Sequence, residues 1–280
     1  TLMNKADRLY IELCQRILNE GDTTMGEKVR PKYADGTPSH TYFVNQVWDE
    51  YDIEKGEFPL ITLRQIAWKS AIKEILWIYQ EQSNDLDLLK NKYGITWWDE
   101  WEVNASRTIG QRYGATVRRY DLMNKLLEGL KNQPYGRRHI INLYQYADFV
   151  ESPGLYPCAM ETHWSVRRGL LDLTLIQRSN DVGMANCINK IQYVALQMMV
   201  ARAVGLTPGR FCHMIQNAHI YDRHVDAIRE MIARPGQENA EAVRLVLNTD
   251  KTDFYSFTIE DFALLNYQPN QPNFKLEIAI

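Results

Sequence analysis

The sequence predicts an α+β fold in one domain: a mixed β-sheet flanked by helices, with a long buried helix at its centre. Segments with helical periodicity and segments with strand-like alternation follow one another without the regular strand–helix–strand repeat of α/β proteins. The helix expected after Asn189 is apolar almost all round, which is typical of a helix buried on every side. No internal repeat or low-complexity linker interrupts residues 1–280, so we expect a single domain over that range.

The first part of the chain is expected to hold two strong helices. Residues 3–20 and residues 65–82 place apolar side chains at helical spacing. Between them, residues 21–40 are polar and rich in turn residues, and residues 42–47 resemble a strand. A Trp-rich loop is expected at 97–101.

The second part of the chain is expected to supply most of the sheet. Residues 119–132 predict a helix, and residues 139–146 predict a strand. Residues 159–168 and 170–178 predict an antiparallel pair that turns at Gly169. Further strands are expected at 208–221, 243–247 and 274–279.

The bulk composition fits an intracellular globular protein. At 280 residues and 45% hydrophobic content, the chain can bury a large core. A net charge of -3 and a pI near 6.1 give no overall basic field, so nucleic acid is not a required partner. The most apolar segment, 191–204, is broken by Gln197 and Arg202, which argues against a membrane span. The four cysteines form no CxxC pair, which favours reduced thiols and a cytoplasmic location.

The segment from Tyr156 to Asn189 gathers the side chains with the most chemistry. A thiol must lose its proton to become a nucleophile, and a nearby guanidinium such as that of Arg178 lowers the cost for Cys158. The carboxamide of Asn189 offers a donor and an acceptor and can read the edge of a heterocycle. A lone cysteine after proline is more often a buried small hydrophobe. The combination nevertheless predicts covalent catalysis on a flat, polar, anionic small molecule.

Other candidate groups have competing interpretations. The six histidines show no HxxxH or HxH spacing, which argues against a metal site. Trp98 and Trp101 stand among acidic residues, and a wall facing a ligand is as well supported as core packing. Arg137 and Arg138 precede an apolar strand, which favours anion binding over a solvated pair of charges. The chain has no P-loop or GxGxxG motif, so a nucleotide would be held by side chains.

Together these motifs resemble the folate-dependent thymidylate synthase family, which also includes pyrimidine-nucleotide hydroxymethylases. The resemblance runs from the first helix to Ile280, with the pieces in the family's order and spacing. The most specific pieces are Arg30 with Asp35-Gly36-Thr37-Pro38-Ser39-His40-Thr41, Glu74-Ile75-Leu76-Trp77, Trp98-Asp99-Glu100-Trp101, Arg137-Arg138, Pro157-Cys158, Gln177-Arg178-Ser179-Asn180-Asp181, Asn189 and His219-Ile220-Tyr221.

The resemblance implies a reaction and an assembly. The reaction is the reductive methylation of dUMP to dTMP, with 5,10-methylenetetrahydrofolate as co-substrate, dihydrofolate as second product and no metal. Cys158 would add to C6 of dUMP as a thiolate, which Arg178 would stabilise. The assembly is a symmetric homodimer, sheet against sheet, in which Arg137 and Arg138 bind the phosphate held in the partner's site.

The resemblance also implies roles for the other site residues. Phosphate would be bound by Arg30, Arg137, Arg138, Arg178 and Ser179. The base and ribose would be bound by Gln177, Asn189, His219 and Tyr221, with Asn189 reading N3–H and O4 of uracil. The folate pocket would be formed by Trp98, Trp101, Asp181, Ala185, Ile188 and Ile280. Glu74 and Tyr113 would manage proton transfers at O4 and C5.

Some positions leave alternative functions open. Residues 184–188 lack the glycine and phenylalanine that the family commonly has there, which changes part of the folate pocket. A dUMP hydroxymethylase, in which water replaces hydride in the last step, is therefore the main alternative; Trp98 and Ile280 favour the synthase. Asn189 argues against a dCMP-type enzyme, which carries Asp at that position. A retired homologue that only binds nucleotide or its own messenger RNA would have no need for Cys158.

Overall fold

A six-stranded sheet forms the centre of the protein, which the computed structural model describes over residues 3–269 and 271–280. The strands lie in the order β1-β2-β6-β5-β4-β3. In the described chain β5 and β6 pair in parallel and the other neighbouring strands pair antiparallel, so the expected mixed sheet is confirmed. The bounds are β1 (Asp22–Thr23), β2 (Thr41–Asp52), β3 (Ile140–Asn142), β4 (Ala159–Arg167), β5 (Leu170–Asp181) and β6 (Thr207–Tyr221).

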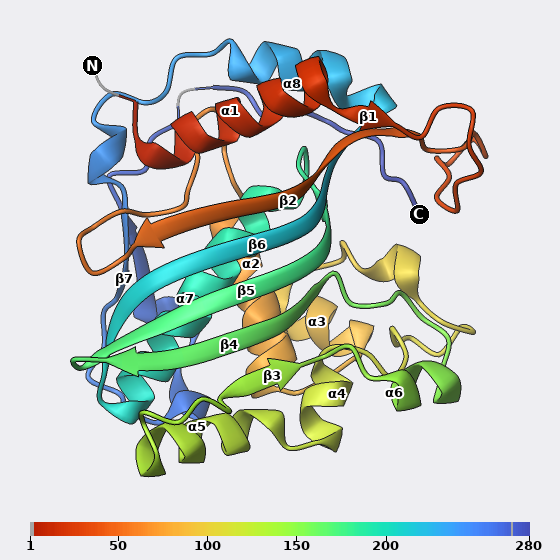
Figure 1. The fold of residues 1–280 in the computed structure, drawn as a ribbon. Helices are drawn as coiled ribbons and strands as arrows, with labels where there is room; N and C mark the ends of the chain where they lie inside the picture. The colour runs from red at the N-terminus through yellow and green to blue at the C-terminus, as the bar shows by residue number, and fades with distance from the viewer. Residues whose placement is uncertain (1–2, 270) are drawn as a thin grey trace.

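Helices lie behind this sheet in the view of Figure 1 and leave the face toward the viewer open. The helix α7 (Asn186–Val204) connects β5 to β6, and α2 (Trp68–Ile75) packs beside it and continues as a π-helical turn, Leu76–Gln80. A separate two-stranded sheet pairs β7 (Arg244–Leu247) with β8 (Phe262–Leu265). The other helices are α1 (Lys5–Glu20), α3 (Leu86–Tyr93), α4 (Gly114–Arg119), α5 (Leu122–Asn132), α6 (Tyr146–Glu151) and α8 (Val225–Ile232).

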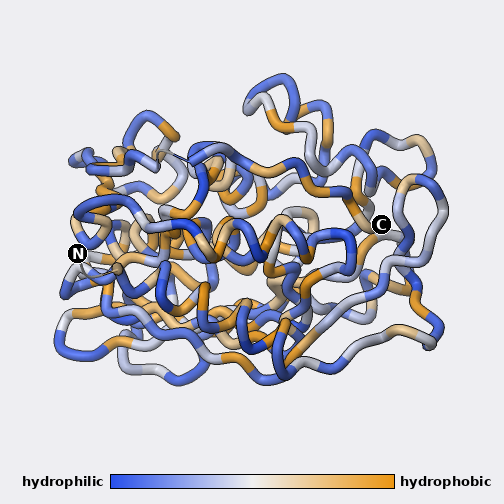
Figure 2. The backbone as a smooth tube through the Cα atoms, turned by 90° about the horizontal axis from the view of Figure 1, so that it is seen from above, coloured by the Kyte–Doolittle hydropathy of each residue, from blue (hydrophilic) through white to orange (hydrophobic). Residues whose placement is uncertain are grey.

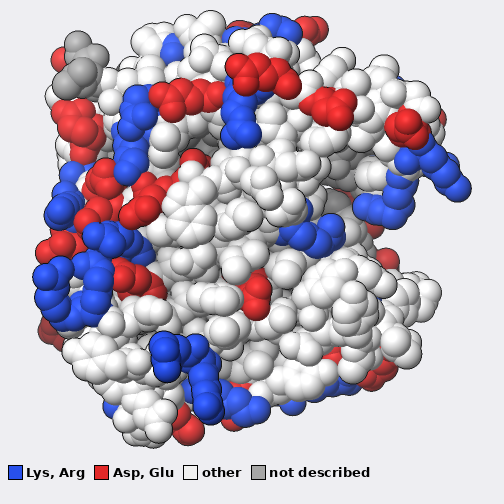
Figure 3. All heavy atoms as spheres, viewed as in Figure 1, with Lys and Arg blue, Asp and Glu red and all other residues white. Residues whose placement is uncertain are grey.

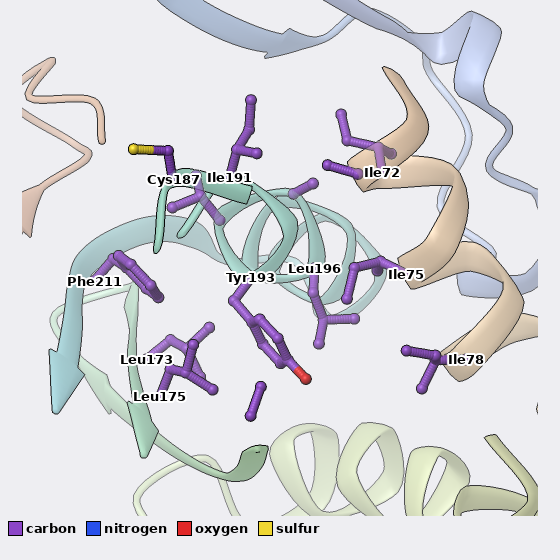
Figure 4. Packing of buried hydrophobic residues seen from close by; sticks show 14 of the residues in the cluster. Ile72, Ile75, Ile78, Leu173, Leu175, Cys187, Ile191, Tyr193, Leu196 and Phe211 are labelled. Carbon is purple, nitrogen blue, oxygen red and sulfur yellow. The ribbon is translucent and has the colours of Figure 1, made fainter. Parts of the chain in front are cut away.

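The helix α7 is the buried central helix expected from the sequence, and it begins at Asn186, shortly before Asn189. Figure 4 shows Ile72 and Ile75 of α2 on one side of it and apolar side chains of β5 and β6 on another. Burial of each such side chain contributes about 1.5–3 kcal/mol. The helix ends at Gly205, whose φ of 75° is the left-handed conformation that glycine adopts without strain. This packing holds the first turn of α7 rigidly against the sheet.

The helix α1 packs against strands β2 and β6 of the sheet. Seen from above in Figure 2, hydrophobic and hydrophilic residues alternate along it. Its inner side buries Tyr10, Leu13 and Ile17. The Asn4 side chain accepts a hydrogen bond from the Asp7 backbone N–H at 2.8 Å and caps the start of the helix. The amphipathic helix expected at residues 3–20 is thus confirmed.

Four expected elements differ in the structure. The strand expected at 139–146 is limited to Ile140–Asn142, because Tyr146 already begins α6. The helix expected at 119–132 is broken between α4 and α5, where Asp121 has a φ of 50°. The strand expected at 42–47 extends from Thr41 to Asp52. The strand expected at 274–279 was wrong: the structure describes all of these residues and gives them no regular secondary structure.

The remaining expected elements are confirmed. The helix at 65–82 forms as α2 with its π-helical turn, and the antiparallel pair around Gly169 forms as β4 and β5. The strands expected at 208–221 and 243–247 form as β6 and β7. The helices and strands missed by the sequence prediction (α3, α6, α8, β1 and β8) have at most eight residues each, which is too short for a clear periodic signal.

Candidate active site

Cys158 directly precedes β4 and lies beside Arg178 of β5. The backbone N–H of Arg178 donates to the carbonyl of Cys158 at 3.2 Å and joins the two chains at this end of the hairpin. The Arg178 guanidinium donates to the carbonyls of Pro157 and Tyr156 at 2.9 Å each, and its Nη2 lies 3.7 Å from the Cys158 Sγ. The Cys158 backbone N–H donates to the Tyr113 hydroxyl at 3.0 Å. The structure therefore brings the expected nucleophile and its expected cation into contact.

Opposing influences act on the ionisation of Cys158. Burial raises the pKa of the Cys158 thiol above its ordinary value, while the positive charges of Arg178 and Arg30 act in the other direction. The negative charge of Asp181 adds to the rise. The raised pKa keeps the Cys158 thiol protonated near neutral pH. The reactive form is the thiolate, and the two arginines lower the free-energy cost of forming it.

Arg112 holds the loop that leads to Cys158, and the sequence did not single it out. Its side chain is 1% exposed. Its guanidinium donates to the backbone carbonyls of residues 111, 148, 152, 154 and 155, at distances from 2.9 to 3.3 Å. The next residue, Tyr113, has a φ of 49° and a ψ of -108°, which is a strained backbone for a tyrosine. The fold thus holds the loop and the Tyr113 hydroxyl in place. The role of Arg112 rests on contacts between segments distant in the sequence, so the sequence pattern does not reveal it.

Glu74 lies at the end of α2 in a buried pocket of hydrogen-bond donors. Its carboxylate accepts from the indole N–H of Trp97 at 3.0 Å and from that of Trp98, and it also accepts from the Gln192 amide. Burial raises the pKa of Glu74, and these donors act against the rise. The Trp98 ring packs edge-on to Tyr113, 5.3 Å between centroids. Gln192 was missed in the sequence, and Trp97 was expected in the Trp-rich loop at 97–101 but not as a donor to Glu74.

The Asn189 carboxamide in the first turn of α7 lies within a row of buried amides. Its Oδ1 accepts from Gln177 Nε2 at 3.0 Å and from Asn180 Nδ2 at 3.5 Å. Its Nδ2 donates to Gln192 Oε1 at 3.0 Å. Through Gln192 the row continues to Glu74. The expected base-reading residue and the expected proton-transfer residue are therefore two hydrogen bonds apart.

The carboxyl ends of β5 and β6 bring a second set of candidates together. Because these strands are parallel, Asp181 lies opposite His219 in the register, and Ser179 lies opposite Asn217. Asp181 Oδ1 accepts from the backbone N–H of Met184 at 3.2 Å, which closes the turn into α7. Burial lowers the pKa of His219, so its ring is neutral at pH 7. The rings of His219 and Tyr221 pack edge-on, 5.1 Å between centroids.

Comparison with known proteins identifies the relatives of this arrangement. Residues 8–280 match the model of a protein family described as thymidylate synthase. The chain belongs to the thymidylate synthase family. Thymidylate synthases of Streptococcus pneumoniae and Streptococcus pyogenes are 48% and 46% identical to it over 283 aligned positions, with 99% of this chain and 100% of each relative covered. The structure of thermostable thymidylate synthase A from Bacillus subtilis superposes with a TM-score of 0.90 at 36% identity, covering 99% of this chain and 100% of that one.

The arginines expected to bind phosphate in this family do not all gather at one Cys158. Arg30 is close enough for its charge to act on the Cys158 thiol. Arg137 and Arg138 are exposed in the turn before β3. The His139 carbonyl accepts from the backbone N–H of Trp164, which fixes this turn beside position 164 of β4. The six steps along the strand from residue 158 to residue 164 span roughly 20 Å, so this pair lies far from Cys158 of its own chain.

The residues expected to form the folate pocket come from several different elements. Trp101 packs edge-on against Trp98, 5.5 Å between centroids. Ala185 caps α7, and its carbonyl accepts from the Asn189 backbone N–H at 2.9 Å. Ile188 is half-buried against the core. The backbone of Ile280 exchanges two hydrogen bonds with Lys32, at 2.9 and 3.0 Å, so the last residue is anchored close to Arg30 in the sequence.

The described residues, 3–269 and 271–280, lack two further features. They contain no group of three or more His, Cys, Asp or Glu side chains placed to hold a metal ion. None of their helices combines the length and the apolar character that crossing a membrane requires.

Proposed function

We propose that this protein catalyses the reductive methylation of dUMP to dTMP, as its membership of the thymidylate synthase family indicates. The observation that carries the proposal is the contact between Cys158 Sγ and Arg178 Nη2 at 3.7 Å, together with the half-buried amide of Asn189, which accepts from Gln177 of the same hairpin. A pure binding protein requires a phosphate site and a base site but no paired thiol and cation. The contact therefore supports covalent chemistry over binding alone.

The nucleophilic step follows from the surroundings of Cys158. As its proton leaves, the thiolate sulfur forms a bond to C6 of uracil, and the electron pair of the C5–C6 double bond moves toward C5 and O4. Asn189 holds O4 and N3–H, and Glu74, whose pKa burial raises, would pass a proton on the O4 side. The Tyr113 hydroxyl accepts a hydrogen bond from the Cys158 backbone N–H and is neutral, so it would relay the C5 proton onward in the later step rather than keep it. Addition of a hydride to the new exocyclic carbon would then push electrons into the C5–C6 double bond, so that the S–C6 bond breaks and Cys158 leaves as a thiolate that takes up a proton.

The entrance of the site fits a flat, polar co-substrate. Trp98 and Trp101 present a half-buried aromatic wall, and Asp181 uses only Oδ1 in a hydrogen bond to the described residues, which leaves Oδ2 for a ring N–H. We assign these three residues to 5,10-methylenetetrahydrofolate, which supplies the one-carbon unit and the hydride when bound. Ala185, Ile188 and Ile280 complete the pocket.

We further propose that the protein works as a homodimer that shares its phosphate sites. Arg30, Arg178 and Ser179 bind phosphate from their own chain, and Arg137 and Arg138 reach the site of a second copy, since roughly 20 Å of strand separates them from their own Cys158. The face of the sheet free of helices is largely uncharged in its middle in Figure 3. It exposes 54% of Trp48, an apolar surface that a second sheet would cover.

The wider setting follows from the same site. The reactive groups span positions 30 to 221, so we propose that residues 1–280 act as one catalytic domain. Cys14, Cys158, Cys187 and Cys212 are all free thiols, as a cytoplasmic enzyme would keep them. The reaction as proposed uses no metal, no membrane and no nucleic acid.

A product assay tests the proposed function. With dUMP and 5,10-methylenetetrahydrofolate, the protein is expected to form dTMP and dihydrofolate in equal amounts, measured by mass spectrometry and by absorbance. Hydroxymethyl-dUMP with tetrahydrofolate as the main products would show that water attacks instead of hydride, and would overturn the synthase proposal in favour of the hydroxymethylase.

A further inference from the structure

A buried chain of polar side chains leads from the far side of α7 to the base-reading amide. Lys190 forms an ion pair with Asp49 of β2 at 3.1 Å, and its Nζ lies 2.8 Å from His213 Nδ1. His213 Nε2 lies 2.7 Å from Gln177 Oε1, and Gln177 Nε2 donates to Asn189 Oδ1 at 3.0 Å. Lys190 is 3% exposed and His213 is 0% exposed. Because these side chains are buried, water does not enter the row and exchange its donors with its acceptors.

The charge of Lys190 decides which group donates in each hydrogen bond of this row. An ammonium group has donors and no acceptor, so His213 Nδ1 must accept from it. Burial and the charge of Lys190 lower the pKa of His213 well below its ordinary value, so the ring stays neutral and carries its one proton on Nε2. That N–H donates to Gln177 Oε1, which turns the Gln177 amide N–H toward Asn189. The Asn189 oxygen is thereby held on the Gln177 side.

This direction matters for the choice of base. Uracil presents an N3–H donor beside an O4 acceptor, and cytosine presents an N3 acceptor beside an N4 donor. With its oxygen on the Gln177 side, the Asn189 amide matches the pattern of uracil. A flipped amide would match the pattern of cytosine. Flipping Asn189 would set its NH₂ against the NH₂ of Gln177. Turning Gln177 as well would set an N–H against the N–H of His213, which Lys190 prevents from changing tautomer. Asn180 braces the same oxygen with a longer contact of 3.5 Å.

We propose that Lys190 and His213 are positioning residues that fix the amide orientation of Asn189 and thereby the preference for uracil over cytosine; this rests on the proposed action on dUMP. Neither residue touches the substrate. A buried ion pair usually stabilises a fold no better than apolar side chains of the same size. The Asp49–Lys190 pair is thus better explained by its effect on the orientation of the Asn189 amide than by a contribution to the stability of the fold.

The test removes the charge pair as a unit. In the double variant Asp49→Asn/Lys190→Met, the His213 ring is free to take either tautomer, and no buried charge is left alone. The dissociation constants of dUMP and dCMP are measured by calorimetry for the variant and the wild type. The preference for dUMP is expected to fall about tenfold, and the KM for dUMP to rise more than kcat falls. Tyr193→Phe is the matched control, because it removes a buried hydrogen bond to Tyr79 from the same helix and should leave the preference unchanged.

A measurement on the wild type makes the test independent of how well the variant folds. Nitrogen-15 NMR of the histidine rings is expected to show His213 as the Nε2–H tautomer from pH 6 to pH 8. A proton on Nδ1, or a preference for dUMP that changes less than twofold in the folded variant, would overturn the proposal. These results differ from failure of the proposed function, in which the wild type itself forms no dTMP.

Discussion

The guanidinium of Arg178 lies 3.7 Å from the thiol of Cys158, across 20 positions of sequence. The pairing of β4 with β5 creates this contact, because it sets the start of one strand beside the end of the other. In this contact the uncharged thiol of Cys158 lies beside the permanently charged guanidinium of Arg178. The ionisation of Cys158 should therefore respond directly to changes at Arg178.

Replacing Arg178 with methionine is expected to raise the pKa of Cys158 further. The positive charge of Arg178 opposes the effect of burial, so its loss disfavours the thiolate. A rise of about one pH unit would lower the thiolate fraction about tenfold at neutral pH. The rate of iodoacetamide reaction at Cys158, followed by peptide mass spectrometry, should shift to higher pH. Arg210→Met, at an exposed arginine that pairs with Glu50, is the control, and equal profiles for both variants would contradict the account.

Cys158→Ser should abolish turnover and preserve the binding of dUMP. A hydroxyl is far less ionised than a thiol at neutral pH, while the contacts to phosphate and base are untouched. Calorimetry with dUMP and an assay of dTMP formation measure the two properties separately. Substantial dTMP formation by this variant would rule out a covalent role for Cys158.

Glu74→Gln should change how stability depends on pH. Burial raises the pKa of Glu74 in the folded protein, so the folded state holds a proton that the unfolded state has released. The contribution of Glu74 to the free energy of unfolding is therefore full below the ordinary pKa and is lost as pH rises through the raised one. Urea unfolding of both proteins from pH 4 to pH 8 should show the wild type losing stability relative to Glu74→Gln as pH rises. A difference that stays constant or grows with pH would contradict this.

Arg112→Met should destabilise the protein by about 2–4 kcal/mol, because it leaves buried carbonyls without donors. The loop 148–157 would lose its anchor, and dTMP formation should fall together with stability. Urea denaturation measures the first effect and steady-state kinetics the second. Arg118→Met is the matched control, since Arg118 donates to two carbonyls from an exposed position. Equal losses of stability in the two variants would show that burial of Arg112 is unimportant.

The shared phosphate site can be tested with mixed dimers. A Cys158→Ser chain and an Arg137→Ala/Arg138→Ala chain should each be nearly inactive alone. In a mixed dimer one site has native Cys158 and receives native arginines from its partner. Random reassortment makes about half of the dimers mixed, each with one good site, so activity should return to about a quarter of native. Verified mixed dimers without recovered activity would show that the arginines act within their own chain.

The sequence predicted the parts of the site that lie in compact motifs. Cys158, Arg178 and Asn189 fall within one hairpin and the helix that follows it, so strand pairing and a short turn are enough to bring them together. Arg112 and Gln192 could not be found this way, because their role depends on contacts between distant segments. His213 looked like one histidine among six without metal spacing, and its partner Lys190 was not singled out.

The fold was predictable where burial creates a strong period and less so at its edges. The helix α7 is buried along most of its length and was expected correctly. Residues 274–279 alternate like a strand, yet no strand among the described residues pairs with them. Their path is set by single contacts, such as the hydrogen bond between the Glu277 carbonyl and the His224 ring at 2.7 Å. Leu143 still donates to the Met160 carbonyl of β4 at 2.7 Å, and the chain then turns away from the sheet into α6.

The most direct test of the central claim is to trap the bond between Cys158 and the nucleotide. In 5-fluoro-dUMP the C5 position carries fluorine, which cannot leave as a proton, so the adduct should accumulate when 5,10-methylenetetrahydrofolate is present. Peptide mass spectrometry of the denatured, digested protein is expected to find the nucleotide on the peptide that contains Cys158, at one per active site. The nucleotide on Cys14, Cys187 or Cys212, or an unmodified Cys158 in a protein that forms dTMP, would contradict the account.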